Sequence, residues 1–364
     1  MRPLGYNVGL LGKKHIGPPA AYPFDDVGKI PSRKDGNAQA LELAQSYVRK
    51  SKQESKRFCL VVAAHDGHHP YTTGDPSQYQ QDQLQISKDA IGTPEYRRVL
   101  TEHLAEVTNL DKLLGKLREM LAEEKVAENT LVLFCSEQGN SFPFSKWSCF
   151  DDGLASGMVA CLPGVIPAGG NCDSMMWLSD VAPTLIEAAG GTAKDDDFDG
   201  RTQWANWLGA SHRVHEYAYG AFTNCHIVDN RERVYPIRSI RNDRYTLIWS
   251  PKAAQDVTSN LTLSKARQVL DSGEPPENDD VASSWVRVAK ETDAPEDDAL
   301  VQRFFHRPEW ALYDRNGDPE ELHNLIEDSD HASITDELKR ELQTWLERWN
   351  DSDPIATEKG FLEE

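Results

Sequence analysis

The chain has 364 residues, of which 39% are hydrophobic and 27% are charged, and its formal net charge is −20. This length is sufficient for one large domain and a smaller one, whereas the acidic charge argues against a nucleic-acid-binding protein, because phosphate backbones are bound by Lys and Arg. No apolar run approaches the ~20 residues that span a bilayer, no signal-peptide pattern opens the chain, and the six cysteines show neither metal-site spacing nor a disulfide framework.

The first predicted strand covers residues 6–11, where apolar side chains alternate and then cluster between glycines. It ends in the basic run Lys13-Lys14-His15, which can bind an anion or simply form a solvated surface loop. A proline-rich loop follows over residues 18–36. Residues 38–50 then have the amphipathic pattern of a helix.

The second predicted strand, residues 58–64, is followed directly by the histidine-rich turn His65-Asp66-Gly67-His68-His69-Pro70. Histidine binds anions when it is protonated and transfers protons near neutral pH, so His68 is a candidate contact for an anionic substrate. A polar loop without a function is the alternative. Thr93-Pro94-Glu95 combines a capping hydroxyl with a proline in the first turn, which predicts a core-packing helix from there to residue 124.

The third predicted strand is the continuous apolar run 131–134, a pattern typical of a strand buried on both faces at the centre of a parallel sheet. Glu137 and Gln138 follow at its carboxyl end, where open α/β sheets bind their ligands. Their side-chain oxygens suit a hard cation such as Ca²⁺ or Mg²⁺, and Lys146 on the next loop adds a positive charge. An ordinary solvated turn is the alternative for Glu137 and Gln138.

The rest of the chain has the pattern of a smaller α+β domain after one more strand and helix. The predicted elements are a strand at 158–162, a helix at 179–189, a boundary loop at 190–200, strands at 217–228 and 234–249, a loop at 271–280 and a helix at 332–349. Arg238 and Arg241 are three residues apart, so on a strand their side chains point to opposite faces. Arg238 and Arg241 are therefore either substrate contacts or ordinary surface or ion-paired arginines, and the sequence favours neither alternative.

Four blocks of the chain resemble the sulfatase family, in family order and over nearly the whole length. Residues 5–17 (GYNVGLLGKKHIG) are similar to the family's Gly-Tyr…Gly-Lys-Trp-His-Leu-Gly segment, and residues 58–70 (FCLVVAAHDGHHP) to its strand followed by His-Asp-Pro-His-x-Pro. Residues 128–153 resemble its strand with Ser-Asp-His/Asn-Gly and a later lysine, and residues 312–325 its Leu-Tyr-Asp…Asp-Pro-x-Glu…Asn-Leu ending. Within the family, the chain resembles bacterial sulfatases similar to heparan N-sulfatase.

The resemblance implies an α/β fold. It is an alkaline-phosphatase-like α/β/α sandwich over residues 1–210, without its first strand and nucleophile segment, followed by a smaller C-terminal α+β subdomain over residues 211–364. It also implies hydrolysis of a sulfate ester or sulfamate on a sulfated small molecule or glycan, by a periplasmic or secreted protein. The family uses Ca²⁺, for which Mg²⁺ is the alternative, and a formylglycine made from a cysteine.

The resemblance assigns roles to individual side chains. Four residues match positions that contact the sulfate group or protonate the leaving group: Lys13, His15, His68 and Lys146. Three more are candidates for substrate contacts: His65, Arg238 and Arg241. Glu137 and Gln138 match the metal ligands, although each is one methylene longer than the family's usual Asp and Asn. A metal ion and cationic side chains would together stabilise the charge that develops on the sulfuryl oxygens.

One part of the family pattern is absent from this sequence. In the family, the paired metal-binding aspartates and the Cys-x-Pro-Ser-Arg signature belong before the segment that matches Gly5. No cysteine of the chain stands in the context of that signature; Cys161, for example, has Val165 where arginine is required. The segment Pro31-Ser32-Arg33 matches the end of the signature but lacks its cysteine. Three hypotheses stay open: a sulfatase that is truncated and inactive as written, a catalytically dead sulfate-binding or interaction module, and a phosphoesterase of the same superfamily with a Ser or Thr nucleophile.

Overall fold

The structure, a computed structural model, describes residues 1–31, 36–194, 197–223, 235–257, 265–272, 280–292 and 294–355. The chain divides into two compact units. Unit 1 comprises Met1–Gln80, Leu100–Ser136 and Gly157–His215, and unit 2 comprises Gln81–Val99, Glu137–Ser156 and Glu216–Glu364. The domain boundary expected between residues 210 and 211 stays a prediction; the last change of unit along the chain follows His215. Two earlier segments, Gln81–Val99 and Glu137–Ser156, also belong to unit 2, so one boundary along the chain does not describe the division.

Unit 1 is built on a parallel sheet with the strand order β2-β1-β3. The central strand β1 (Tyr6–Gly12) pairs with β2 (Asp25–Gly28) on one side and with β3 (Arg57–Ala63) on the other. β1 and β3 are the first two predicted strands, whereas β2 lies in the segment that the sequence predicted to be a loop. The register aligns Gly12 with Ala63, so β1 and β3 end side by side.

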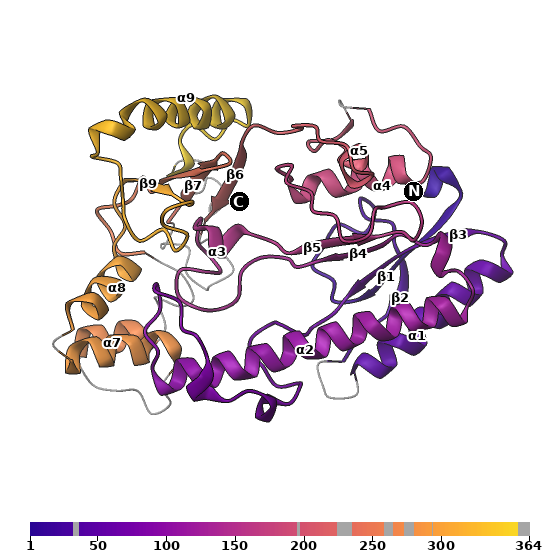
Figure 1. The fold of residues 1–364 in the computed structure, drawn as a ribbon, viewed down its shortest axis with the longest axis horizontal. Helices are drawn as coiled ribbons and strands as arrows, with labels where there is room; N and C mark the ends of the chain where they lie inside the picture. The colour runs from indigo at the N-terminus through magenta and orange to yellow at the C-terminus, as the bar shows by residue number, and fades with distance from the viewer. Residues whose placement is uncertain are drawn as a thin grey trace. The chain divides into compact units, whose positions relative to one another are not determined.

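Two long helices pack along this sheet, α1 (Gly36–Gln53) and α2 (Pro94–Glu123), as Figure 1 shows. Leu11 of β1 lies in one buried apolar cluster with Ala44 of α1 and Leu113 of α2. Both helices occupy the places that the sequence predicts for them, because each carries an apolar stripe at helical spacing. The prediction of a parallel α/β core in this part of the chain is therefore confirmed.

The strand predicted at 131–134 is β4 (Val132–Cys135), and the prediction that it lies at the centre of a parallel sheet is wrong. β4 pairs antiparallel with β5 (Met158–Cys161) in a separate two-stranded sheet, and its residues are partly exposed. The chain reverses direction between the two strands. The N–H of Ser136 donates to the carbonyl oxygen of Gly157 at 2.9 Å, and the N–H of Gly157 donates to the Ser136 hydroxyl oxygen at 2.7 Å. An apolar run alone does not encode the direction of its partner strand.

The other helical elements of unit 1 are short. They are η1 (Arg2–Leu4), η2 (Pro76–Gln78), η4 (Ala127–Asn129), η5 (Leu178–Asp180), α4 (Val181–Ala188) and α5 (Trp204–Trp207). Together η5 and α4 form the helix predicted at 179–189. The boundary loop predicted at 190–200 includes residues 195 and 196, and the Pro31-Ser32-Arg33 segment includes residues 32 and 33, all outside the described residues.

Unit 2 contains an antiparallel sheet whose strands are β6 (Ala218–Phe222), β7 (Ile237–Arg241), β8 (Tyr245–Trp249) and β9 (Trp310–Asp314), in that order. The single strand predicted at 234–249 is thus a hairpin. Its turn forms because the side-chain oxygen of Asn242 accepts hydrogen bonds from the N–H groups of Arg244 at 2.9 Å and Tyr245 at 2.7 Å. Residues 224–228, which include Cys225, and residue 234 lie outside the described residues.

The described helices of unit 2 include four that the sequence did not predict: α3, α6, α7 and α8. The helical elements are η3 (Gln81–Gln83), α3 (Asp151–Leu154), α6 (Lys265–Ser272), α7 (Val281–Glu291), α8 (Pro295–Phe305), η7 (Ser329–His331) and α9 (Ala332–Arg348). α9 matches its prediction and packs Leu342 in one cluster with Leu247 of β8. α6 extends into the loop predicted at 271–280, of which 273–279 lie outside the described residues. Across the described ranges, no helix has the length and apolarity that a membrane crossing requires.

Candidate active site

The first group of candidate residues lies where β1 and β3 end in unit 1. The backbone N–H of Lys13 donates to the carbonyl oxygen of Ala63 at 3.0 Å, which extends the pairing of the two strands by one step. The loop that carries Lys13 and His15 therefore begins beside the turn that carries His65 and His68. Lys13 is half-buried and His15 is exposed. Ligands of parallel sheets bind at this edge.

The histidine-rich turn is held in place by a buried carboxylate, Glu106 of α2. This side chain is 2% exposed and accepts hydrogen bonds from the backbone N–H groups of Gly67 (2.9 Å), Thr72 (2.7 Å) and Thr73 (2.9 Å). Sequence reasoning missed Glu106, because its helix was predicted only to pack the core. The available signal was a carboxylate on the apolar stripe of that helix, since buried Glu side chains are rare unless they are paired.

A second carboxylate, Asp66, fixes the same turn from within. It accepts hydrogen bonds from the side-chain amides of Asn37 (2.9 Å) and Asn109 (2.7 Å) and from the Thr73 hydroxyl (2.6 Å). These contacts occupy the Asp66 carboxylate within the protein. The neighbouring His68 ring is exposed, and its Nδ1 lies 2.6 Å from the carbonyl oxygen of His69. Because a carbonyl oxygen only accepts hydrogen bonds, this contact places a hydrogen on Nδ1 of His68.

The second group of candidates lies on one loop of unit 2, between β4 and α3. Glu137 and Gln138 are both exposed, and the Glu137 carbonyl oxygen accepts a hydrogen bond from the Ser156 hydroxyl at 2.7 Å. Lys146 is half-buried, its N–H donates to the Asn140 carbonyl oxygen at 2.9 Å, and its ammonium nitrogen lies 5.2 Å from the centre of the Trp147 ring. The loop is therefore folded back on itself around Lys146.

The fit of a Ca²⁺ ion to Glu137 and Gln138 is incomplete. Their oxygens are of the right type, but Ca²⁺ takes about six to eight oxygen ligands, and these two adjacent residues supply only part of that number. Within the described part of the chain, no group of three or more His, Cys, Asp and Glu side chains is arranged to hold a metal ion. Glu137 and Gln138 therefore do not form a metal site by themselves.

The cysteines give no candidate for the formylglycine precursor. The described cysteines are all unpaired: Cys59, Cys135, Cys149, Cys161 and Cys172. None of them has the signature residues of the family around it. Burial raises the pKa of the Cys149 thiol to about 11 and that of Cys59 and Cys135 above the ordinary value, so these three are not activated thiolates either.

The two arginines of β7 are buried and ion-paired. Arg238 is 3% exposed and its Nε lies 2.6 Å from a carboxylate oxygen of Asp351. Arg241 is 8% exposed, lies 2.5 Å from Asp151 and donates to the carbonyl oxygen of Cys149 at 3.0 Å. The alternative weighed from the sequence, ion-paired arginines, describes both side chains. Their contacts do not favour a role in binding substrate.

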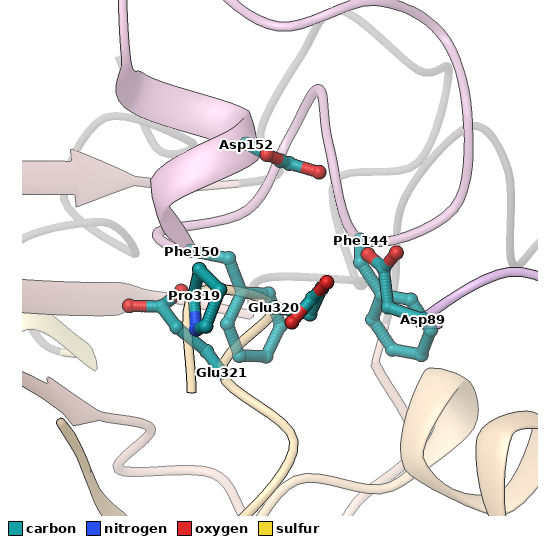
Figure 2. Close-up of a pocket in the computed structure, with 7 residues that line it drawn as sticks. All are labelled: Asp89, Phe144, Phe150, Asp152, Pro319, Glu320 and Glu321. Atoms are coloured by element: carbon teal, nitrogen blue, oxygen red, sulfur yellow. The ribbon is translucent and has the colours of Figure 1, made fainter. Parts of the chain in front are cut away.

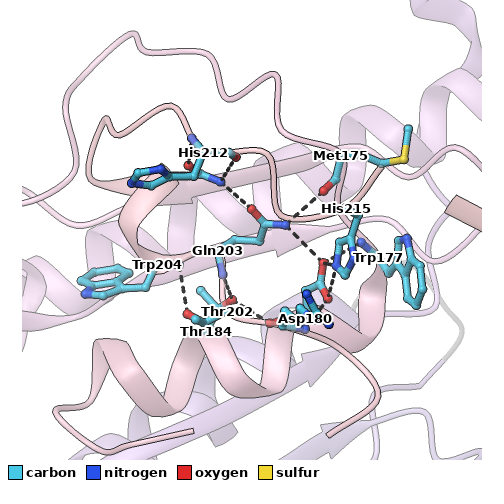
Figure 3. Close-up of polar contacts among 11 residues, drawn as sticks. Met175, Trp177, Asp180, Thr184, Thr202, Gln203, Trp204, His212 and His215 are labelled. Atoms are coloured by element: carbon cyan, nitrogen blue, oxygen red, sulfur yellow. Dashed lines mark hydrogen bonds and ion pairs between the residues drawn. The ribbon is translucent and has the colours of Figure 1, made fainter. Parts of the chain in front are cut away.

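Two further polar features lie outside these groups of candidates. A small cavity in unit 2 is lined by Asp89, Phe144, Phe150, Asp152, Pro319, Glu320 and Glu321 (Figure 2). In unit 1, the fully buried Asp180 accepts hydrogen bonds from the N–H groups of Trp177 (2.9 Å) and Arg201 (2.7 Å) and from His215 (2.9 Å), whose ring stacks on Trp177 (Figure 3). The Asp180 cluster is satisfied by the protein itself and joins the last segment of unit 1 to α4.

Comparison with known proteins identifies relatives over the whole chain. The family model described as "Sulfatase" matches residues 4–191. An ulvan-active sulfatase of Formosa agariphila is 28% identical over 375 residues, which cover 99% of this chain and 67% of that protein. The N-sulphoglucosamine sulphohydrolase of Homo sapiens is 24% identical over 417 residues, which cover 99% of this chain and 75% of that protein.

Solved structures share the fold. The structure of a protein in complex with its substrate D-glucosamine-2-N,6-O-disulfate superimposes with a TM-score of 0.62 at 15% identity and covers 97% of this chain and 82% of that one. This chain spans only 60% and 59% of two other matching structures. Because the family model extends over more than half of the chain and the α/β fold agrees with these structures, the chain belongs to the sulfatase family, whose fold is alkaline-phosphatase-like.

Proposed function

We propose that this protein is a hydrolase of sulfate ester or sulfamate groups on a sulfated sugar or glycan. The observation that carries the proposal is the parallel pairing of β1 with β3, which brings the loop of Lys13 and the turn of His68 to one edge of the sheet. Cationic and proton-transferring side chains at such an edge suit an anionic substrate. Two relatives, one active on ulvan and one named for N-sulphoglucosamine, support a sulfated carbohydrate.

We assign the sulfate group to a small set of side chains. In unit 1, Lys13 and His15 bind sulfate oxygens, and His68 binds sulfate or protonates the leaving group. In unit 2, Lys146 is assigned separately as a sulfate contact, because it matches the family's lysine. The net charge of −20 makes a local positive site necessary, because the acidic chain as a whole repels a sulfated ligand. His65 is a further proposed substrate contact, since it opens the same turn as His68.

Catalysis requires groups that these residues do not supply. Glu137 and Gln138 offer two of the oxygen ligands for Ca²⁺, and no described cysteine stands in the signature context. We therefore propose no reaction step through the metal or through formylglycine on residues 1–364, and we propose that these residues alone are inactive. A missing nucleophile removes the covalent route, and positioning groups retain little rate without it.

The strand edges of unit 1 support this proposal. Among the described residues, β3 pairs only with β1 and β4 only with β5. Both strands are apolar, and none of their residues is fully buried. Apolar strands with an unpaired edge are normally paired or covered. One more strand between or beside them would bury these edges, and we propose that it carries the missing signature.

A binding experiment on the existing chain tests the site. Removing one charged contact to sulfate is expected to weaken binding of a sulfated glucosamine oligosaccharide about tenfold or more. We expect this loss for Lys13→Ala. Lys14→Ala is the matched control, because Lys14 is paired with Asp26 at 2.5 Å and should retain binding. Equal affinities for the two variants in calorimetry would show that Lys13 does not contact the ligand.

Substrate class and location are tested separately. Sulfated glycosaminoglycan oligosaccharides and small aryl sulfates can be compared as substrates of the form that carries formylglycine, and exclusive preference for aryl sulfates would count against a glycan substrate. A periplasmic or secreted location suits glycan hydrolysis. Fractionation of the producing cells would test that proposal directly.

A further inference from the structure

Three residues with an unusual backbone conformation belong to the loop that carries Lys146 or contact it. Among the described residues, six that are not glycine have a positive φ. Three of them follow the ends of α1, α2 and α9, where a left-handed residue is common: Ser55, Lys125 and Asn350. The other three follow no helix: Phe144 (φ 65°), Trp147 (φ 66°) and Glu321 (φ 51°). Bulky side chains rarely adopt this conformation, which costs free energy and persists only where the surroundings fix it.

Hydrogen bonds within the loop tie Lys146 to the residues that follow it. The Lys146 N–H donates to the carbonyl oxygen of Asn140 at 2.9 Å. The hydroxyl of the preceding residue, Ser145, donates to the carbonyl oxygen of Asp152 at 2.8 Å. The place of Lys146 therefore depends on where residues 149–152 are held.

Arg241 of β7 attaches these residues to the antiparallel sheet of unit 2. Its guanidinium lies 2.5 Å from the Asp151 carboxylate and donates to the carbonyl oxygen of Cys149 at 3.0 Å. The guanidinium presents its donors in a fixed planar arrangement, so two simultaneous contacts set direction as well as distance. β7 is paired on both sides, with β6 and β8, and thus gives Arg241 a fixed base.

Glu321 holds the same residues from the loop after β9. Its side chain is 2% exposed, and its carboxylate accepts a hydrogen bond from the Asp151 N–H at 2.8 Å. Burial raises the pKa of Glu321, whereas the Asp151 N–H and the charge of Arg241 oppose that rise. Glu321 and Phe144, two of the residues with positive φ, also line one small cavity (Figure 2). Buried glutamates are rare unless they are paired, which indicates that this contact has a specific role.

We propose that Arg241 and Glu321 are positioning residues that hold Lys146 for contact with a sulfate group. The inference rests on the proposed function, in which Lys146 is a sulfate contact. Neither positioning residue needs to touch the ligand, because both act on the segment of Cys149 and Asp151. Without them the loop would relax from its strained conformation, and the fraction of molecules with Lys146 in the binding orientation would fall. The apparent affinity falls by the same factor.

Amide hydrogen exchange at Lys146, measured on the full chain without ligand, tests the positioning. Glu321→Leu and Arg241→Met should each speed exchange about tenfold or more, since the loop loses one buried contact. Glu321→Gln should stay close to the natural rate, because its amide oxygen can still accept from the Asp151 N–H.

Arg238→Met is the matched control for this exchange experiment. It removes another buried arginine of the same strand, whose partner is Asp351 and not the loop of Lys146, so exchange at Lys146 should not change. Equal acceleration in Arg238→Met and Glu321→Leu would overturn the proposal, because a general loss of stability would explain both. Natural exchange rates in Glu321→Leu and Arg241→Met would overturn it as well.

Calorimetry with a sulfated glucosamine oligosaccharide tests whether Glu321 acts through Lys146. Glu321→Leu should weaken binding about tenfold in the natural chain and not at all in a chain that already carries Lys146→Ala. The same loss in both backgrounds would contradict the proposal, because the effect would then not pass through Lys146. An unchanged affinity in Lys146→Ala alone would instead remove Lys146 from the proposed function, a result on which the exchange rates do not depend.

Discussion

The buried carboxylate of Glu106 provides a sharp test of how the fold positions the histidine-rich turn. In Glu106→Gln, the amide oxygen can still accept from Thr72 and Thr73, but the amide NH₂ then faces the N–H of Gly67, so two donors meet. One buried donor left unsatisfied costs about 1–3 kcal/mol, and the two remaining bonds lose their charge assistance. The expected loss is about 2–4 kcal/mol, a large part of the ~5–15 kcal/mol that stabilises a typical domain.

Urea unfolding followed by tryptophan fluorescence measures this loss, and amide hydrogen exchange at Gly67 reports whether the turn opens locally. Glu119→Gln is the control, because Glu119 is an exposed carboxylate of the same helix. We expect Glu106→Gln to lower the midpoint of unfolding and to speed exchange at Gly67, with neither change in the control. Identical midpoints and exchange rates in the two variants would refute the assignment of Glu106 as the anchor of the turn.

Three further predictions follow from buried contacts. Asp180→Asn should destabilise the fold by about 1–3 kcal/mol. Burial alone raises the pKa of Asp180, but the hydrogen bonds from His215 and from backbone N–H groups hold this pKa below 3.8. The stabilisation by the carboxylate is therefore present above pH 3.8 and lost in stronger acid, where the variant and the natural chain should differ least. Arg238→Met should lower the free energy of unfolding by about 3–5 kcal/mol, because it leaves Asp351 unpaired. A second change, Asp351→Leu, should recover part of this stability in urea unfolding. An unchanged midpoint of unfolding in Arg238→Met would argue that the ion pair is not formed. Gly139→Ala should lower the unfolding temperature markedly, because an added Cβ would lie 1.9 Å from a backbone carbonyl oxygen, and normal stability would show that this loop is not packed as described.

The sequence predicts local structure well wherever one short pattern decides it. Thr93 caps α2 with its hydroxyl, which accepts a hydrogen bond from the N–H of Tyr96 at 3.1 Å, and the preference of hydroxyl residues for that position made the start of the helix predictable. The α/β class and the family also followed from the sequence, because residues 5–17 and 58–70 keep the order of strand and polar turn. β1 and β3 lie within a residue or two of their predicted limits.

The errors concern partners that are far apart in the sequence. The apolar residues of β4 do not indicate that its partner β5 is antiparallel. Apolar and polar residues alternate on both sides of Asn242, so the sequence pattern does not indicate the hairpin turn there. Glu106 contacts Gly67 across 39 residues, and no local pattern indicates such a pair. Of the site itself, the sequence predicted which loops carry the cationic side chains. It did not predict that the buried carboxylate of Glu106 holds the histidine-rich turn.

The central claim is that residues 1–364 carry sulfate-binding side chains of a sulfatase but not its nucleophile. Sulfate release from a sulfated glucosamine oligosaccharide, measured for this chain and for a form extended upstream to include a signature cysteine converted to formylglycine, tests it directly. We predict background rates for residues 1–364 and turnover for the extended form, lost again on Lys146→Ala. Measurable turnover by residues 1–364 that Lys146→Ala abolishes would contradict the claim, because the nucleophile would then lie within this sequence.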